Sequence, residues 1–225
     1  MDVTLDGQEH HHLANVRRCK PDEVVVLFCG DEYDYKYRIS NILRDETRLE
    51  FISREKNKRN PKVGLTVYIG LIRTDNLSWV IEKLSEIGAT ELVPFKCARS
   101  NVPTELVNIS RLQTIAEQSC KQSGRSIPLR VLPVLGFNEM ISSLDGFDEV
   151  YYADRGEKRK KISQVEKKGH GHVCLVLGPE GGFNMDENME IAMRATPITL
   201  GARTLRSETA AIVATALILS ELGEI

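Results

Sequence analysis

Between residues 65 and 222, short apolar runs alternate with stretches in which apolar residues recur at helical spacing. The apolar runs are typical of buried strands, and they fall at 65–70, 91–95, 149–153, 173–178 and 197–201. The helical spacing predicts helices at 77–87, 105–122, 137–144, 184–195 and 207–222. This alternation predicts an α/β fold with a mainly parallel sheet covered by helices. In such sheets, ligands bind at the carboxyl ends of the strands.

The first quarter of the chain has a different pattern. Residues 24–55 contain "VVVLF", "YDYKYRISNI" and "RLEFIS", which are short runs rich in β-branched and aromatic residues, separated by turn signals. They predict a small all-β domain. The segment "REKNKRNPK" at 54–62 has almost nothing to bury and is expected to be an exposed linker. We therefore expect two domains, at residues 1–60 and 63–225.

Composition excludes several classes of protein. With 30 basic and 32 acidic residues, bulk charge gives no argument for nucleic-acid binding, so any such argument must be local. Five scattered cysteines without a Cys-x-x-Cys pair argue against a disulfide framework and a zinc site, and favour a reduced cytoplasm. No signal-peptide core and no run of eighteen apolar residues occurs, so we expect neither export nor a membrane span. Adjacent His10, His11 and His12 are expected to be surface residues, and no metal is expected.

Two glycine-containing loops follow the last two predicted strands. They read "LGPEGGF" at 177–183 and "TLGARTLRSETAA" at 199–211, and each leads into a predicted helix. Neither contains a phosphate-binding glycine pattern, and Glu180 would place a carboxylate where a phosphate needs donors. A ligand with an adenine and a cationic centre suits the loops better, which favours S-adenosylmethionine. The spacing of Asn184 and Glu187 predicts a capping box, and Ser207 is expected to cap the last helix.

These two loops carry a family resemblance. Together they resemble the paired signature of the 16S (small-subunit) ribosomal RNA uridine-N3 methyltransferases, a family of the knotted SPOUT class of S-adenosylmethionine-dependent enzymes. Other stretches agree in the same order along the chain: "HHL" and "VRR" near the start, "WVIEKLSEIGATELVPF" (79–95), "RSN" (99–101) and "EQSCKQSGRSIP" (117–128). The resemblance implies an amino-terminal PUA-like β-barrel that binds RNA, a carboxyl-terminal SPOUT domain with a trefoil knot, and a homodimer.

The resemblance also implies a set of cofactor-binding residues. One wall of the pocket would be Leu177, Gly178, Pro179, Glu180, Gly181 and Gly182. The other wall would be Leu200, Gly201, Leu205 and Ser207. We expect them to contribute backbone hydrogen bonds and apolar packing around adenine.

The implied reaction gives two further residues a role. Methylation of uridine N3 requires loss of its proton and stabilisation of negative charge on O2 and O4. Arg206 is expected to stabilise that charge, as preorganised donors stabilise other oxyanions. Glu208 is the expected base, with Glu180 and water as alternatives.

N3 lies on the Watson–Crick edge, so the target base must be unpaired or flipped out, which favours structured RNA, expected in the assembled small subunit. The RNA-binding candidates are Arg17, Arg18 and Lys20, then Lys56, Lys58 and Arg59 in the linker, and Arg73, Arg99, Gln122 and Arg125 nearer the site. The run "KRKK" (158–161) is either a further RNA contact or a solvated loop. Two alternatives stay open: a knotted methyltransferase acting on another RNA or on a ribose hydroxyl, and an RNA-binding assembly factor without catalysis.

Overall fold

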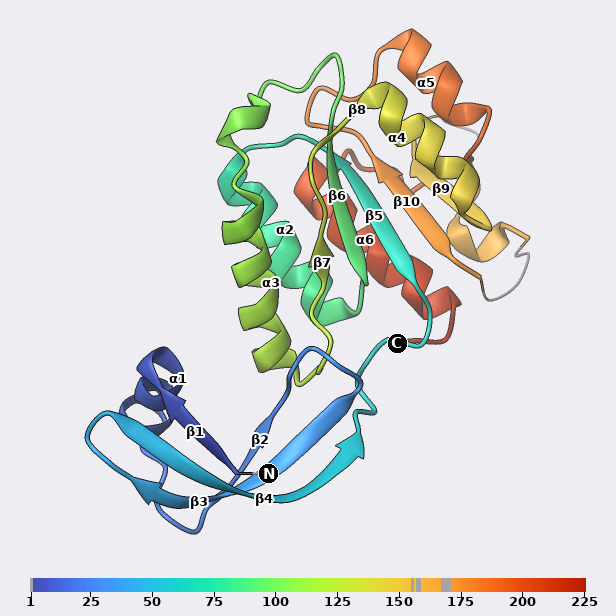
Figure 1. Ribbon diagram of the computed structural model, residues 1–225. Helices are drawn as coiled ribbons and strands as arrows, with labels where there is room; N and C mark the ends of the chain where they lie inside the picture. The colour runs from blue at the N-terminus through green and yellow to red at the C-terminus, as the bar shows by residue number, and fades with distance from the viewer. Residues whose placement is uncertain (1, 155, 157–158, 167–170) are drawn as a thin grey trace. The chain divides into compact units, whose positions relative to one another are not determined.

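The computed structural model describes residues 2–154, 156, 159–166 and 171–225 (Figure 1). The chain forms two compact units. One comprises residues 1–60 with 125–127, and the other comprises residues 61–124 with 128–225. Among the helices of the described residues, none is long and apolar enough to cross a membrane.

The first unit is built on an antiparallel sheet with the strand order β1-β4-β3-β2. Its strands are β1 (Val3–Asp6), β2 (Val24–Leu27), β3 (Tyr33–Ile42) and β4 (Glu46–Lys56). Alternate residues such as Val25, Ile39 and Leu49 are buried on one face, as expected for a sheet with one solvated side. The three predicted strands are confirmed, and β1 was missed because four residues give too short a pattern.

One helix of this unit was missed, and two expectations were wrong. Helix α1 (Gly7–His11), with the π-helical turn His12–Val16, was not predicted because the segment lacks an apolar stripe. His10 lies on this helix and is buried, with Nδ1 2.8 Å from the Thr47 hydroxyl, so it is not a surface residue. The expected linker starts later than residue 54. Strand β4 continues to Lys56, and buried Asn57 donates a hydrogen bond to Asp34.

The second unit contains a sheet with the order β11-β9-β10-β5-β6-β7, and β8 also pairs with β6. Each of these pairs is parallel, which confirms the predicted class. The strands are β5 (Leu65–Gly70), β6 (Glu91–Lys96), β7 (Arg130–Val131), β8 (Leu135–Gly136), β9 (Glu149–Ala153), β10 (Val173–Leu177) and β11 (Thr196–Ile198). The α-helices are α2 (Thr74–Ile87), α3 (Ile109–Ser123), α4 (Phe137–Ser143), α5 (Met185–Ala192) and α6 (Ser207–Glu221). The trefoil knot stays a prediction.

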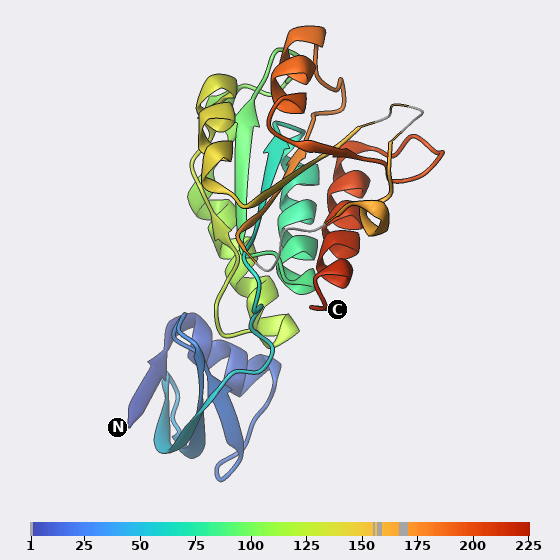
Figure 2. The ribbon, with the colours of Figure 1, turned by 90° about the vertical axis from the view of Figure 1, so that its right-hand side faces the viewer.

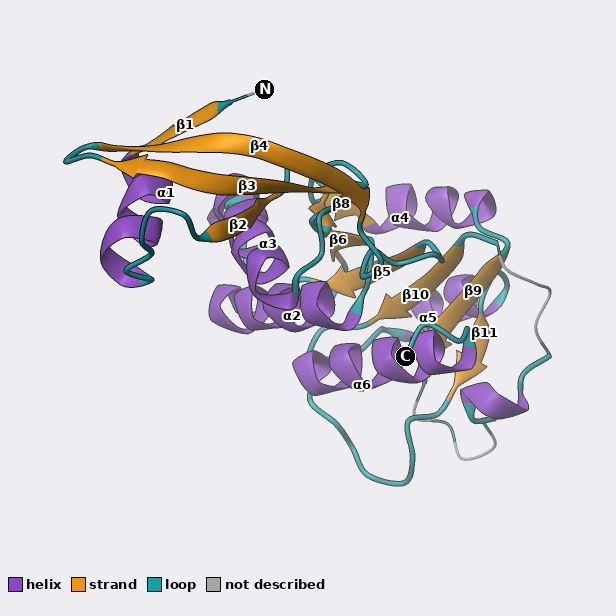
Figure 3. Cartoon of the chain, turned by 90° about the horizontal axis from the view of Figure 1, so that it is seen from below, coloured by secondary structure: helices purple, strands orange, loops and turns teal. Residues whose placement is uncertain are grey.

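Helices cover both faces of this sheet. One apolar layer joins the sheet to α2, α3 and α6, and a second joins its other face to α4 and α5. Figures 2 and 3 show α4 and α6 on opposite sides of the strands. Strands β5 and β10 lie inside the sheet, and every residue of both is buried. Their continuous apolar runs therefore follow from burial on two faces.

Helix α2 shows how the sequence determines an element of this layer. Leu77, Val80, Ile81 and Leu84 recur at helical spacing, and all are fully buried against the sheet. Gly88 ends the helix with φ +118°, a left-handed conformation that an L side chain rarely adopts. The apolar stripe of the helix predicted at 77–87 is confirmed, and the helix ends at Ile87 as predicted.

A matched pair of Leu→Ala variants tests this packing. Leu84 is fully buried, whereas Leu106 is 63% exposed. Leu84→Ala should lower the free energy of unfolding by about 3 kcal/mol, because it removes buried methyl groups and leaves a cavity. Leu106→Ala should cost less than about 1 kcal/mol. Equilibrium urea denaturation followed by circular dichroism measures both, and similar losses would contradict the assigned packing.

Candidate functional site

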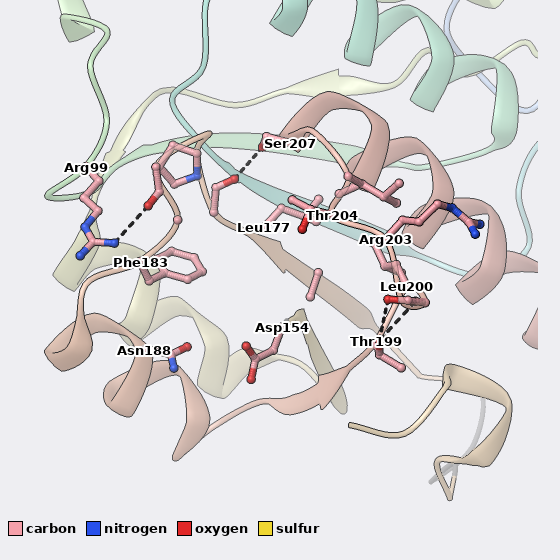
Figure 4. A pocket seen from close by; sticks show the side chains of 18 of the residues that line it. Arg99, Asp154, Leu177, Phe183, Asn188, Thr199, Leu200, Arg203, Thr204 and Ser207 are labelled. Carbon is pink, nitrogen blue, oxygen red and sulfur yellow. Dashed lines mark hydrogen bonds between the residues drawn. The ribbon is translucent and has the colours of Figure 1, made fainter. Parts of the chain in front are cut away.

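A cavity of about 350 Å³ opens where β9, β10 and β11 end (Figure 4). Its volume falls in the range of small-molecule and cofactor sites. Two walls come from the loops after β10 and β11. The lining residues are Arg99, Ala153, Asp154, Leu177, Gly178, Pro179, Gly181, Gly182, Phe183, Asn188, Thr199, Leu200, Gly201, Ala202, Arg203, Thr204, Leu205, Ser207 and Ala210.

Strand order explains why these loops meet. Strand β9 pairs in parallel with β10 on one side and with β11 on the other. The carboxyl ends of all three strands therefore lie at one edge, with the end of β9 between the two loops. The loops are neighbours in space although α5 separates them in the chain.

The loop after β10 lies close against the sheet. A Cβ on Gly70, at the end of β5, would lie 2.5 Å from Cδ of Pro179, so only glycine permits this approach. The amide of Gly182 donates to the carbonyl of Pro179 at 2.9 Å and closes a tight turn, in which Gly182 has φ +67°. Backbone groups are thus held at the cavity wall in one conformation.

Ser207 joins the two loops. Its hydroxyl donates to the carbonyl of Gly178 at 2.6 Å, and the side chain is buried. The expectation that Ser207 caps α6 was wrong, because the N-cap position is Arg206 and Ser207 is the first residue of the helix. The hydroxyl instead connects one cavity wall to the other.

The amino terminus of α5 fixes a third loop. Asn184 and Glu187 form the predicted capping box, with hydrogen bonds of 2.8 and 3.0 Å. The second carboxylate oxygen of buried Glu187 accepts from the amide of Ala98 at 2.7 Å. The adjacent Arg99 donates to the carbonyl of Gly181 at 3.2 Å. The loop after β6 is thereby attached to the loop after β10.

The structure brings together nine of the ten predicted cofactor-binding residues. The exception is Glu180, which is exposed and does not line the cavity. In the second loop, Gly201 has φ +108°, and its amide donates to the Thr199 hydroxyl at 3.2 Å. Both glycine-containing loops therefore require glycine for backbone reasons. The cofactor role of these residues stays a prediction.

The two predicted catalytic residues have different environments. Arg206 is exposed, immediately before Ser207 at the start of α6. Glu208 is only 7% exposed and is not among the lining residues. Within the described part of the chain, its Oε2 has no hydrogen-bond partner. A carboxylate buried outside the cavity does not contact a uracil bound there. The geometry therefore does not support Glu208 as the general base.

The predicted RNA-binding residues are also divided. Arg17, Arg18 and Lys20 are exposed in one loop, and Arg18 has φ +54°, which is uncommon outside glycine. Exposed Arg73 follows β5 and lies at the same edge of the sheet as the cavity. Arg99 lines the cavity itself.

Neither Gln122 nor Arg125 is among the lining residues of the cavity. Gln122 lies in the last turn of α3, a helix that returns from the carboxyl edge to the amino edge of the sheet. Arg125, three residues later, is 3% exposed, so its guanidinium offers RNA almost no surface.

Sequence reasoning missed several lining residues, of which Asp154 is the most informative. It is the first residue after β9, and Figure 4 shows its side chain reaching into the cavity between Asn188 and Thr199. The rule that ligands bind at carboxyl ends of strands could have found it, but it was applied only to the loops with glycine patterns. Asn188, Phe183 and Arg203 also line the cavity.

Part of the run "KRKK" is linked to this site. Lys158 lies outside the described residues. Arg159 donates from Nε to Oδ2 of Asp154 at 2.7 Å, and the carbonyl of Lys160 accepts from the amide of Thr199. The described part of the run is therefore attached to the cavity and is not merely a solvated loop.

Comparisons with known proteins agree with this geometry. The family profile described as RNA methyltransferase domain matches residues 58–219, and the profile described as RNA methyltransferase PUA domain matches residues 5–51. Ribosomal RNA small subunit methyltransferase E of Bacillus subtilis is 30% identical over 226 residues, covering 94% of this chain and 87% of the relative. The protein of the same name from Rickettsia conorii is 26% identical, covering 95% and 88%.

Solved structures show the same fold. A crystal structure of a ribosomal RNA small subunit methyltransferase E from Neisseria gonorrhoeae, bound to S-adenosyl methionine, has a TM-score of 0.87 at 24% identity. It matches 98% of this chain, and the match covers 92% of that protein. A putative methyltransferase from Legionella pneumophila, also in complex with that cofactor, has a TM-score of 0.86 at 20% identity, covering 98% and 92%. At these identities the likeness establishes the fold of this chain.

The connection made by Ser207 can be tested without a ligand. Ser207→Ala should lower the free energy of unfolding by about 1 kcal/mol, because the Gly178 carbonyl loses its buried donor. Amide hydrogen exchange across residues 178–183 should become faster, since the loop is no longer tied to α6. The matched control is Ser220→Ala, an exposed serine on the same helix, which should change neither quantity. Unchanged exchange in Ser207→Ala would show that the hydrogen bond does not hold the loop.

Proposed function

This chain belongs to the RNA methyltransferase family whose profile spans residues 58–219, and we propose that it methylates N3 of a uridine in 16S ribosomal RNA with S-adenosylmethionine as donor. The observation that carries the proposal is the cavity between the loops after β10 and β11. Nine residues expected to bind that cofactor line it together. Relatives named as small-subunit ribosomal RNA methyltransferases align along nearly the whole chain, which supports the same substrate class.

The cavity has the properties that such a cofactor requires. Its walls present backbone amides and carbonyls in fixed turns, which suit the donor and acceptor edge of adenine. Leu177, Leu200 and Leu205 supply apolar surface for the flat base. Of the charged lining residues, Arg99 and Arg203 are cationic, which suits the carboxylate of the cofactor's methionine part, and Asp154 is anionic. When bound, the cofactor supplies an electrophilic methyl group on a sulfonium centre.

The residues of the chain have two tasks in this reaction. The N3–H proton must leave, and the negative charge that develops on O2 and O4 must be stabilised until the N3–CH₃ bond has formed. Exposed Arg206 next to the cavity is the proposed donor to that charge. For the proton, the geometry favours exposed Glu180 or water over buried Glu208.

The RNA is proposed to bind as a structured element of the small subunit, with the target base turned out of its pairing. Arg17, Arg18 and Lys20 are the proposed phosphate contacts of the first unit, and Arg73 and Arg99 are those nearest the cavity. We further propose a cytoplasmic homodimer, which sedimentation would show at about twice the chain mass of 25.3 kDa.

The first test is methyl transfer. Small ribosomal subunits from cells lacking the gene should accept label from S-adenosylmethionine, and nucleoside analysis should find N3-methyluridine. Arg206→Ala should lower the rate by about 10²- to 10³-fold, because a charge-stabilising donor is lost. Cofactor affinity should change by less than about twofold, since Arg206 does not line the cavity. Arg206→Lys should restore only part of the rate.

Other results of this experiment would indicate a different function. Label in a different nucleoside, or on naked RNA but not on subunits, would indicate a methyltransferase with another RNA target. Cofactor binding without transfer to any ribosomal RNA would argue against the proposed substrate. Failure to bind the cofactor would contradict the proposed function and favour an assembly factor.

A second test concerns the basic loop of the first unit. Arg17→Ala and Lys20→Ala should each weaken RNA binding and reduce the slope of log K against log salt by about one, as expected for a lost phosphate contact. The control is Arg48→Ala. Arg48 is an exposed arginine of the same unit that already pairs with Glu46 at 2.9 Å. Equal effects of all three variants would show that general charge, and not this loop, governs binding.

A further inference from the structure

We propose that Asp154 recognises the donor by accepting hydrogen bonds from its ribose hydroxyls, and that Arg159 positions Asp154 for this. The inference rests on the proposed function, because it assigns a residue to a nucleoside-containing ligand of the same cavity. It adds a carboxylate to a site whose other expected contacts are backbone groups and apolar side chains. Neither glycine-containing loop contributes it.

Strand order places Asp154 at the centre of the site. The residue directly follows β9, which lies between β10 and β11, so its side chain emerges between the two loops that form the walls. Its amide donates to the carbonyl of Ile198 at 3.0 Å, which ties the backbone to the end of β11. Figure 4 shows the carboxylate inside the cavity, with Asn188 on one side and Thr199 on the other.

Asp154 is the only carboxylate among the described residues that line the cavity. A carboxylate accepts hydrogen bonds and donates none, so it selects donor groups on a ligand. The donors of a nucleoside are its ribose hydroxyls and the amino group of the base. Apolar residues and backbone groups of the two loops suit the base and its amino group. The ribose hydroxyls are therefore the donors that remain to pair with Asp154.

Arg159 makes hydroxyls a better partner than a cation. Its Nε donates to Oδ2 of Asp154 at 2.7 Å, and the carboxylate side chain is 17% exposed. A carboxylate that is already paired has less attraction for a second positive charge, and the guanidinium would repel an ammonium or sulfonium group nearby. Lone pairs remain on the carboxylate after this pairing, enough to accept from two neighbouring hydroxyls.

The surroundings of Asp154 strengthen such bonds. The adjacent Tyr152 is buried, and its pKa is raised by burial and then by the negative charge of Asp154. The carboxylate therefore borders a poorly hydrated region, where hydrogen bonds to a charged acceptor are stronger than in water. Removing the carboxylate would leave the hydroxyls of a bound ligand without this partner.

The test compares two competitors of labelled S-adenosylmethionine, adenosine and 2′,3′-dideoxyadenosine, by equilibrium competition. The wild-type protein should bind adenosine about tenfold or more tightly than the dideoxy compound, as expected when hydrogen bonds to a charged group are lost. In Asp154→Ala this preference should fall to about twofold or less, with dideoxyadenosine affinity nearly unchanged. Arg159→Ala should retain a reduced preference, because the acceptor is present but less well positioned.

Two further variants keep the result interpretable. Asp154→Asn preserves the side-chain volume and should also lose most of the preference, so misfolding of Asp154→Ala would not leave the question open. Asp186→Ala removes an exposed carboxylate from the first turn of α5, outside the cavity, and should keep the full preference. It controls for the change in net charge.

Three outcomes would overturn the inference, and they differ from failure of the proposed function. Equal wild-type affinities for the two competitors would show that no ribose contact exists. Equal weakening of both competitors in Asp154→Ala would show a structural effect only. An unchanged preference in that variant would assign the hydroxyls to another residue. If the wild-type protein bound neither the cofactor nor adenosine, the proposed function itself would fail.

Discussion

The parallel pairing of β9 with both β10 and β11 is the constraint on which the site depends. It places three carboxyl ends at one edge of the sheet, although α5 and β11 separate the two loops along the chain. The cavity exists because these loops diverge around the end of the middle strand. A different order of the same strands would keep the apolar core but would separate the loops from Asp154.

The loops keep their conformation through a small number of specific contacts. Gly70 allows Pro179 to pack against the sheet, and the Ser207 hydroxyl donates a hydrogen bond to the Gly178 carbonyl. The Glu187 carboxylate accepts a hydrogen bond from the amide of Ala98. Each contact links a different pair of segments, so the walls are positioned before any ligand arrives. Preorganisation of this kind reduces the entropy that binding would otherwise cost.

Much of the fold could be predicted because its signals are local. The apolar stripe of α2, the stop at Gly88 and the buried run of β10 each follow from residues adjacent in sequence or one turn apart. The capping box of Asn184 and Glu187 belongs to the same class. Helix α1 was not predicted because its few residues show no helical spacing of apolar side chains. Burial of His10 depends on Thr47, 37 residues away, and no local pattern reports such a contact.

The sequence by itself determined the α/β class, the two glycine-containing loops and the resemblance that connects them with RNA methylation. These features could be recognised because each depends on residues that are close together in the chain. Only the tertiary structure decided which side chains face the cavity. In the structure, the Ser207 hydroxyl connects the two loops and does not cap α6, and Glu208 lies outside the cavity. Arg125 is buried, and Asp154 lies between the two walls. The physical reason is that exposure and contact depend on strand order and on the packing of distant segments, which residue spacing along one segment does not encode.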